Sequence, residues 1–309
     1  MRLLNSHRFG SGATPPPSLL YDNVLAMYSL RRPNMTTLWT KAVIRVSIEG
    51  TNNRRFVFFD SNGVISGSSP VSEDVNTPSA TTLSTWSGTD TILLKEWYAI
   101  TTDNTVNDDF ILEADPNDAR SPVLMVGGSF LTSNSNPTVG FQKTTIQQMT
   151  AKAQVISSFS STGYFSIMCV TENKKSLSTG KFFTNANNGG FYLHHDTSSG
   201  KTMATIPPSS IVYINSELSV DQQRIQLMTY KPVIPPAPAL VKGYYNNILQ
   251  NTLSAYTSFD NEGLKIGGEA QVSSEIFQGN ISEIIIMDED VSGSYTSYFD
   301  EVNSYYQTY

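Results

Sequence analysis

Short β-prone runs recur at a regular spacing through the second half of the sequence, and this rhythm constrains the fold more than any other feature. Residues of Gly, Asn, Ser and Pro separate one run from the next. The predicted strands are 150–159, 163–171, 181–184, 190–195, 203–206, 211–214, 224–231, 240–245, 263–267 and 280–287. Many short strands with such punctuation predict a sandwich or a barrel. The last segment, 292–309, carries aromatic residues at helical spacing and predicts a helix packed on that sandwich.

The first half of the sequence is less regular. Its predicted strands are 42–48, 55–59, 91–100 and 122–126, and 66–90 is predicted to be a long loop. Segment 22–32 predicts a short amphipathic helix that begins at Asp22 and stops before Pro33. The triple proline 15–17 favours an extended tail. We therefore divide the chain into a flexible attachment tail (1–20), a β-rich region (21–143) and a sandwich domain (144–309).

Composition and charge limit the partners of this chain. The formal net charge is −7, and such a surface argues against nucleic acid and anionic membranes as partners. Cys169 is the one cysteine of the sequence, so an intrachain disulfide is excluded and a buried small hydrophobic residue is expected there. No run reaches the roughly 20 apolar residues of a membrane-spanning helix, and the first residues lack the apolar stretch of a signal peptide. Synthesis in the cytoplasm is expected.

The order of motifs after residue 220 resembles the laminin-G or concanavalin-A-like jelly roll. The matching segments are 224–230, the Tyr-Tyr-Asn-Asn stretch 244–247, Leu-Lys-Ile-Gly-Gly at 264–268 and Phe-Gln-Gly-Asn-Ile-Ser-Glu followed by isoleucines at 277–286. In that family a Gly occupies the position of Asn247, which is expected to adopt positive φ in a hairpin turn. The resemblance implies an all-β, concanavalin-A-like (laminin-G-like) jelly-roll sandwich, with short flanking helices and an irregular β-rich N-terminal region.

The first half is similar to a group of tailed-phage structural proteins. The segments that carry this likeness are Ala-Met-Tyr-Ser-Leu-Arg-Arg at 26–32, Ala-Val-Ile-Arg-Val at 42–46, the Trp-Tyr pair 97–98 and Ser-Pro-Val-Leu-Met-Val at 121–126. The group's Asp-Gln-Ser-Gly-Asn run is replaced here by Ala-Ile-Thr-Thr-Asp-Asn at 99–104. The resemblance implies a virion structural protein made in the host cytoplasm and displayed on the particle as a fibre, a spike or a decoration.

Within this interpretation, contacts with other virion proteins are expected through the basic tail, with Arg2, Arg8 and Phe9 as attachment residues. A disordered terminus without a partner is the alternative. A homo-oligomer is expected, with a trimer favoured because fibres and spikes are commonly trimeric. The 15 tyrosines would suit such an interface.

Glycan contact is the expected activity of the sandwich. Tyr192 and His195 are its candidate residues, because aromatic rings stack on pyranose faces. The alternative for this stretch is an ordinary polar strand end. A free carbohydrate-binding lectin module, without a particle, is the alternative function.

Catalytic activity is not expected from this sequence. Enzymes of the fold that cleave polysaccharides place acidic residues alternately along one strand as Glu-x-Asp-x-x-Glu, and no such run occurs. We therefore predict a protein that is not an enzyme, with a polysaccharide-cleaving enzyme as the last alternative. No cofactor is expected except calcium, for which Asp115 and Asp118 in an oxygen-rich Asp-Pro-Asn-Asp loop are candidates. Ordinary turn chemistry explains that loop equally well.

Overall fold

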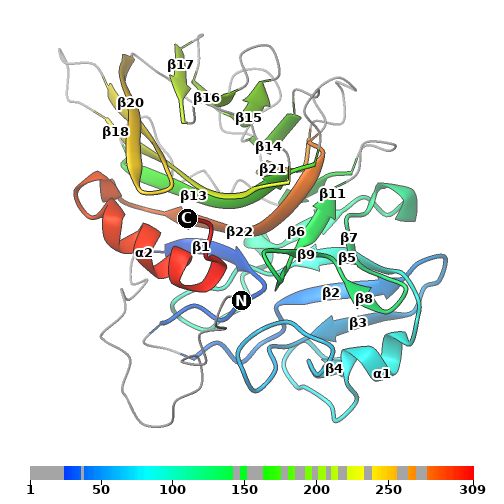
Figure 1. The fold of residues 1–309 in the computed structure, drawn as a ribbon. Coiled ribbons are helices and arrows are strands. Elements are labelled where there is room, and N and C mark those ends of the chain that lie inside the picture. The colour runs from blue at the N-terminus through cyan, green and yellow to red at the C-terminus, as the bar shows by residue number, and fades with distance from the viewer. Residues whose placement is uncertain are drawn as a thin grey trace, which may run out of the picture.

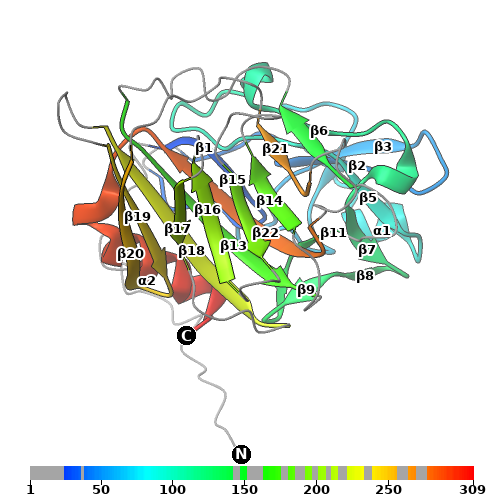
Figure 2. The same cartoon turned by 90° about the horizontal axis from the view of Figure 1, so that it is seen from above.

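Antiparallel strands build almost all of the molecule (Figure 1). The computed structural model describes residues 24–35, 38–141, 147–151, 163–174, 180–184, 192–196, 201–206, 210–214, 221–232, 239–255, 264–268 and 277–309. Within these ranges the strands form two curved layers, with one long helix against the second layer (Figures 1 and 2).

The first layer is an antiparallel series in which each strand pairs with the next. In spatial order it comprises β4 (Val71–Ser72), β3 (Arg54–Val57), β2 (Ile44–Ile48), β5 (Ile92–Trp97), β6 (Leu112–Ala114), β12 (Met149–Ala151), β21 (Lys265–Ile266), β14 (Gly180–Thr184), β15 (Tyr192–Asp196), β16 (Lys201–Ile206) and β17 (Ser210–Tyr213). The strands of the first half of the sequence therefore form one end of this layer, and β6 joins them to the later strands through β12.

The second layer is centred on β13 (Phe165–Asn173) and β22 (Gly279–Met287). It continues from β13 through β18 (Gln223–Lys231), β19 (Ala239–Tyr245) and β20 (Ile248–Ala255). The other edge of β22 pairs with β1 (Val24–Ser29) and β11 (Val139–Phe141). From β11 the layer passes to β7 (Val123–Val126), which also pairs with β5 and β8 (Ser129–Phe130). A separate small hairpin joins β9 (Thr132–Ser133) and β10 (Asn136–Pro137).

Apolar side chains fill the space between the layers. Phe165 stacks on Tyr230 with ring centroids 4.9 Å apart, and Phe277 contacts the rings of both Phe141 and Phe182. Cys169 on β13 is fully buried among them, as predicted, and burial raises the pKa of its thiol. The result confirms the predicted class: an all-β, concanavalin-A-like jelly-roll sandwich.

The predicted C-terminal helix is confirmed as α2 (Tyr295–Tyr306). It lies against the second layer near β1 and β22 (Figure 1), where Phe299 and Val302 are fully buried and the Tyr295 ring contacts Tyr244 at 4.4 Å. The remaining helical segments are short. They are α1 (Leu83–Ser87), within the predicted loop 66–90, and the 3-10 turns η2 (Asp108–Phe110), η3 (Asp118–Arg120) and η4 (Val291–Gly293). None of the helices in the described ranges is long and apolar enough to cross a membrane.

The predicted helix over 22–32 is wrong, because residues 24–29 form β1. The strand pairs with β22, with Met27 opposite Ile285 and Tyr28 opposite Ile284. Ala26, Met27, Tyr28 and Ser29 are all fully buried. A strand covered on both faces loses the alternating pattern of an exposed strand, and its continuous apolar residues imitate the broad face of a helix. The predicted N-cap, Asp22, lies outside the described residues.

Two further predictions concern connections. The hairpin between β19 and β20 turns at Asn246 and Asn247 with φ of 43° and 66°, which confirms the expected positive φ at Asn247.

Strand pairs cross the predicted division at residues 143 and 144, since β1 and β11 pair with β22 and β6 pairs with β12. The β-rich first half therefore shares its sheets with the second half.

Candidate functional site

The two faces of the first layer differ sharply in the region of β3, β2, β5, β6 and β12. Side chains that point into the core form one cross-strand row, and all of them are buried: Val57, Ile44, Trp97, Leu112 and Ala151. The neighbouring row points away from the core, and all of its members are half-buried: Phe56, Arg45, Glu96, Glu113, Thr150 and Lys265. We call this second row, together with Tyr98, the glutamate face.

Glu96 is the best-defined group of the glutamate face. Its Oε1 accepts a hydrogen bond from Arg45 Nη1 at 2.9 Å, and its Oε2 accepts one from the hydroxyl of Tyr98. Burial, and then this bond to Glu96, raise the pKa of Tyr98 well above its usual value, so the phenol remains a donor at physiological pH. The carboxylate is thereby fixed by one cation and one neutral donor.

An aromatic ring lies beside this carboxylate. The Arg45 guanidinium stands 4.9 Å from the centroid of the Phe56 ring, and the Phe56 and Tyr98 rings are 6.0 Å apart. Phe56 is half-buried. The face therefore combines an apolar ring with charged and neutral hydrogen-bonding groups.

Glu113 lies directly opposite Glu96 across the β5–β6 pair. Directly opposed residues have Cβ atoms about 5 Å apart, and like charges in this arrangement are destabilising. Arg45 pairs with Glu96 and offsets this repulsion. Two opposed carboxylates on one half-buried face make the glutamate face a candidate functional site.

The face continues beyond Glu113 with polar groups on β12. Thr150 is opposite Glu113, and its Oγ1 accepts a hydrogen bond from Gln148 Nε2 at 2.7 Å. Gln148 Oε1 is buried and has no hydrogen-bond partner among the described residues. An unmet buried acceptor beside a row of polar side chains is suited to a hydroxyl donor from a ligand.

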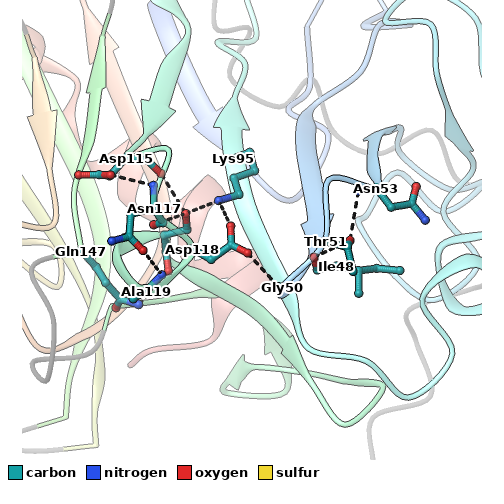
Figure 3. Close-up of polar contacts among 11 residues, drawn as sticks. Ile48, Gly50, Thr51, Asn53, Lys95, Asp115, Asn117, Asp118, Ala119 and Gln147 are labelled. Atoms are coloured by element: carbon teal, nitrogen blue, oxygen red, sulfur yellow. Dashed lines mark hydrogen bonds and ion pairs between the residues drawn. The ribbon is translucent and has the colours of Figure 1, made fainter.

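A polar cluster supports β5 from the loop after β6 (Figure 3). The bulge that places Arg45 opposite Glu96 and Val46 opposite Leu94 leaves Lys95 as the additional residue of β5. The Lys95 side chain is 4% exposed, and its Nζ bonds Asp118 Oδ1 at 2.5 Å and Ser121 Oγ at 2.8 Å. Asp118 Oδ2 accepts the Gly50 N–H at 2.9 Å, so one carboxylate ties together the β2–β3 turn and β5.

The two aspartates predicted to bind calcium belong to this cluster. Burial acts to raise the pKa of Asp118, but the hydrogen bonds from Lys95 and Gly50 outweigh it and hold that pKa below its usual value. Asp115 Oδ2 pairs with Arg120 at 3.2 Å and Oδ1 accepts the Asn117 N–H. Both carboxylates are already neutralised by cations, and the described ranges contain no group of three or more His, Cys, Asp or Glu side chains suited to a metal. Calcium binding at this loop stays a prediction.

Two of the other predicted site residues, Tyr192 and His195, have their backbone in β15, where Tyr192 is opposite Thr184 and His195 is opposite Gly180. Thr184 is in turn opposite Lys265 of the glutamate face, so the backbone of Tyr192 lies two strands beyond Lys265 in the same cross-strand row. The side chains of Tyr192 and His195 lie outside the described part of the chain, and so do Arg2, Arg8 and Phe9. A glycan-binding role for the first pair and an attachment role for the other three stay predictions.

Comparisons with known proteins identify the architecture. The sequence matches no family model and no curated protein sequence. Among solved structures, an arabinofuranosidase complexed with arabinofuranosyl-α-1,2-xylobiose superposes over 92% of this chain, at 11% identity and a TM-score of 0.58. A GH54 α-L-arabinofuranosidase soaked with a cyclic sulfate inhibitor gives the same values. The chain spans 62% of the length of each. The CBM40 of Ruminococcus gnavus IT-sialidase, bound to α2,3 sialyllactose, covers 44% of this chain and 81% of its own at 12% identity, with a TM-score of only 0.37. At these identities the likeness shows the fold alone.

The prediction that the chain is not an enzyme is contradicted by this comparison, because the structures that share its fold over 92% of its length are glycosidases. The sequence argument considered only carboxylates that alternate along one strand. It did not consider carboxylates that strand pairing brings opposite each other, as it does for Glu96 and Glu113. Sequence reasoning singled out none of Arg45, Phe56, Glu96, Tyr98 and Glu113. The sequence shows a Glu within the predicted strand 91–100 and another in the short apolar stretch 110–114, and nothing in it pairs the two.

Proposed function

We propose that the protein binds carbohydrate on the glutamate face. The observation that carries the proposal is the half-buried Phe56 ring lying beside the Arg45–Glu96 pair and the Tyr98 phenol. A sugar presents an apolar C–H face and a rim of hydroxyls. An aromatic ring packs against the first, and carboxylate and guanidinium groups bond the second. Carbohydrate-processing proteins of the same fold support this reading.

A glycan array with the labelled full-length chain, followed by calorimetric titration of the best ligand, tests the proposal. Phe56→Leu keeps an apolar side chain and removes the aromatic face, so the affinity should fall about tenfold, the equivalent of 1.4 kcal/mol of ring contact. Tyr164→Ala is the matched control, because Tyr164 is an aromatic residue that is 46% exposed and outside the face. Equal affinities of the Phe56→Leu variant and the wild type would refute the assignment of the face.

We also propose that this glycan contact serves a virion structural protein of a tailed phage, displayed outside the particle after synthesis in the host cytoplasm. The support is the resemblance of segments 26–32, 42–46 and 121–126 to phage structural proteins. In this proposal residues 1–20 dock on other virion proteins and the displayed part contacts host glycans as a trimer. The native mass of the chain, measured with and without residues 1–20, tests it. A trimer in both forms is expected, whereas a monomer in both forms would favour the free lectin module.

A further inference from the structure

We infer that Glu96 and Glu113 form a catalytic pair that hydrolyses a glycosidic bond of the bound glycan with retention of anomeric configuration. This inference rests on the proposed function and assigns an activity to the same face. It starts from three facts: the two glutamates are directly opposed, Glu96 is fixed by Arg45 and Tyr98, and an aromatic ring adjoins them.

The placement of the pair fits retention. Retaining glycosidases hold their two carboxyl groups about 5–5.5 Å apart, whereas inverting enzymes need about 6.5–9.5 Å to admit a water molecule. Directly opposed positions on adjacent antiparallel strands have Cβ atoms about 4.5–5.5 Å apart. Glu96 and Glu113 are directly opposed on β5 and β6, so their side chains can bring the carboxyl groups to the retaining separation.

The environment of Glu96 suits the nucleophile. Arg45 bonds one of its oxygens and Tyr98 the other, so the group is oriented as a carboxylate with lone pairs left on both atoms. The Glu96 side chain is 14% exposed, so the carboxylate is in contact with solvent at the glutamate face. Glu113, on the neighbouring strand and equally half-buried, is then the acid and base of the pair.

The reaction balances with water as the only co-reactant. A Glu96 oxygen attacks the anomeric carbon while the glycosidic C–O bond breaks, and the leaving oxygen takes the proton of the Glu113 carboxyl group. Water then attacks the anomeric carbon and gives its proton to Glu113, and the bond between the sugar and Glu96 breaks. Two inversions at one carbon give net retention.

Groups next to the pair would position the sugar. The Phe56 ring lies on the Glu96 side, and Thr150 and Gln148 lie on the Glu113 side. The buried Gln148 Oε1, which has no hydrogen-bond partner within the described ranges, would accept a hydrogen bond from a sugar hydroxyl. The substrate therefore crosses β2, β5, β6 and β12 with its scissile bond over the β5–β6 pair.

The test measures reducing ends released from the polysaccharide that the wild-type chain binds best on the array. Release by the wild type is expected, and both Glu96→Gln and Glu113→Gln should lower the rate at least about 100-fold while binding changes by less than about tenfold. Glu49→Gln, at an exposed turn residue outside the face, is the control and should keep the wild-type rate.

Rescue by azide distinguishes the roles of nucleophile and of acid and base from a loss of activity that is due to altered structure. Glu113→Ala should be rescued by azide and give a glycosyl azide of retained configuration, whereas Glu96→Ala should give the inverted glycosyl azide. Binding without any release of reducing ends would overturn this inference and leave the proposed function standing, as would unchanged rates in both glutamine variants. Absence of binding to every glycan would overturn both.

Discussion

Two arginine–glutamate pairs in this molecule use the same chemistry in opposite surroundings. Arg31 pairs with Glu283 at 3.2 Å, with side-chain exposures of 6% and 0%. Arg45 pairs with Glu96 at 2.9 Å, with exposures of 32% and 14%. Burial decides what each pair can do, because a buried pair governs stability and a half-exposed pair can meet a ligand.

The buried pair joins the first described strand to the last strand and the closing helix. Arg31 also bonds Glu301 of α2 at 2.9 Å, and its guanidinium lies 5.3 Å from the Tyr305 ring and 5.8 Å from the Tyr306 ring. Burial raises the pKa of Glu283 to about 7, in spite of the opposing effect of Arg31. The cluster holds α2 in place. Keeping the Glu283 carboxylate ionised in this buried position lowers the stability of the fold.

The largest expected effect comes from breaking the buried pair. Arg31→Met leaves Glu283 without its cation, and the free energy of unfolding at pH 8 should fall by about 3–5 kcal/mol in urea titrations. The control is Arg55→Met, because the partner of Arg55, Glu73, has 80% of its side chain exposed. That variant should lose less than about 1 kcal/mol. Equal losses in the two variants would remove the distinction drawn between buried and exposed pairs.

The next effect is a pH dependence that belongs to Glu283. Its folded pKa of about 7 lies above the ordinary value of 4.5, so the ionised form destabilises the fold. The free energy of unfolding should therefore rise as the pH falls from about 8 to about 5, by about 2.5 kcal/mol from this group. Urea titrations of the wild type and of Glu283→Gln across this range isolate the contribution. A wild-type curve parallel to that of the variant would show that Glu283 does not titrate there.

The smallest effect on stability is expected at the half-exposed pair. Arg45→Met should lower the free energy of unfolding by less than about 1 kcal/mol, because solvent screens the pair. Glycan affinity or turnover should nevertheless fall at least about tenfold, since Glu96 loses the cation that orients it. Thermal unfolding and calorimetric titration on the same sample give both numbers. A large loss of stability with intact binding would show that the Arg45–Glu96 pair stabilises the fold and does not serve the ligand.

Much of the fold could be predicted from the sequence where strands have one exposed face or a strong turn signal. The paired asparagines of the β19–β20 hairpin and the aromatic stripe of α2 are local features, and both predictions were confirmed. β1 could not be recognised, because its burial on both faces depends on the distant strand β22 and on α2.

The candidate site could not be predicted for a related reason. Glu96 and Glu113 are brought together by strand pairing, and Arg45 and Phe56 join them from β2 and β3. No local pattern marks four strands as neighbours before the topology is known. By contrast, Asp115 and Asp118 were singled out because they are close in sequence, and the structure shows them paired with Arg120 and Lys95.

The position of β22 has a consequence for biosynthesis. Its residue Glu283 bonds Arg31, 252 residues earlier, and the same strand supplies the partner edge of both β1 and β13. At a synthesis rate of about 5–20 residues per second, β1 waits roughly 13–50 s for that edge. Throughout this interval β1 lacks the strand edge with which it pairs in the fold, so the order of synthesis delays closure of the second layer until β22 has emerged.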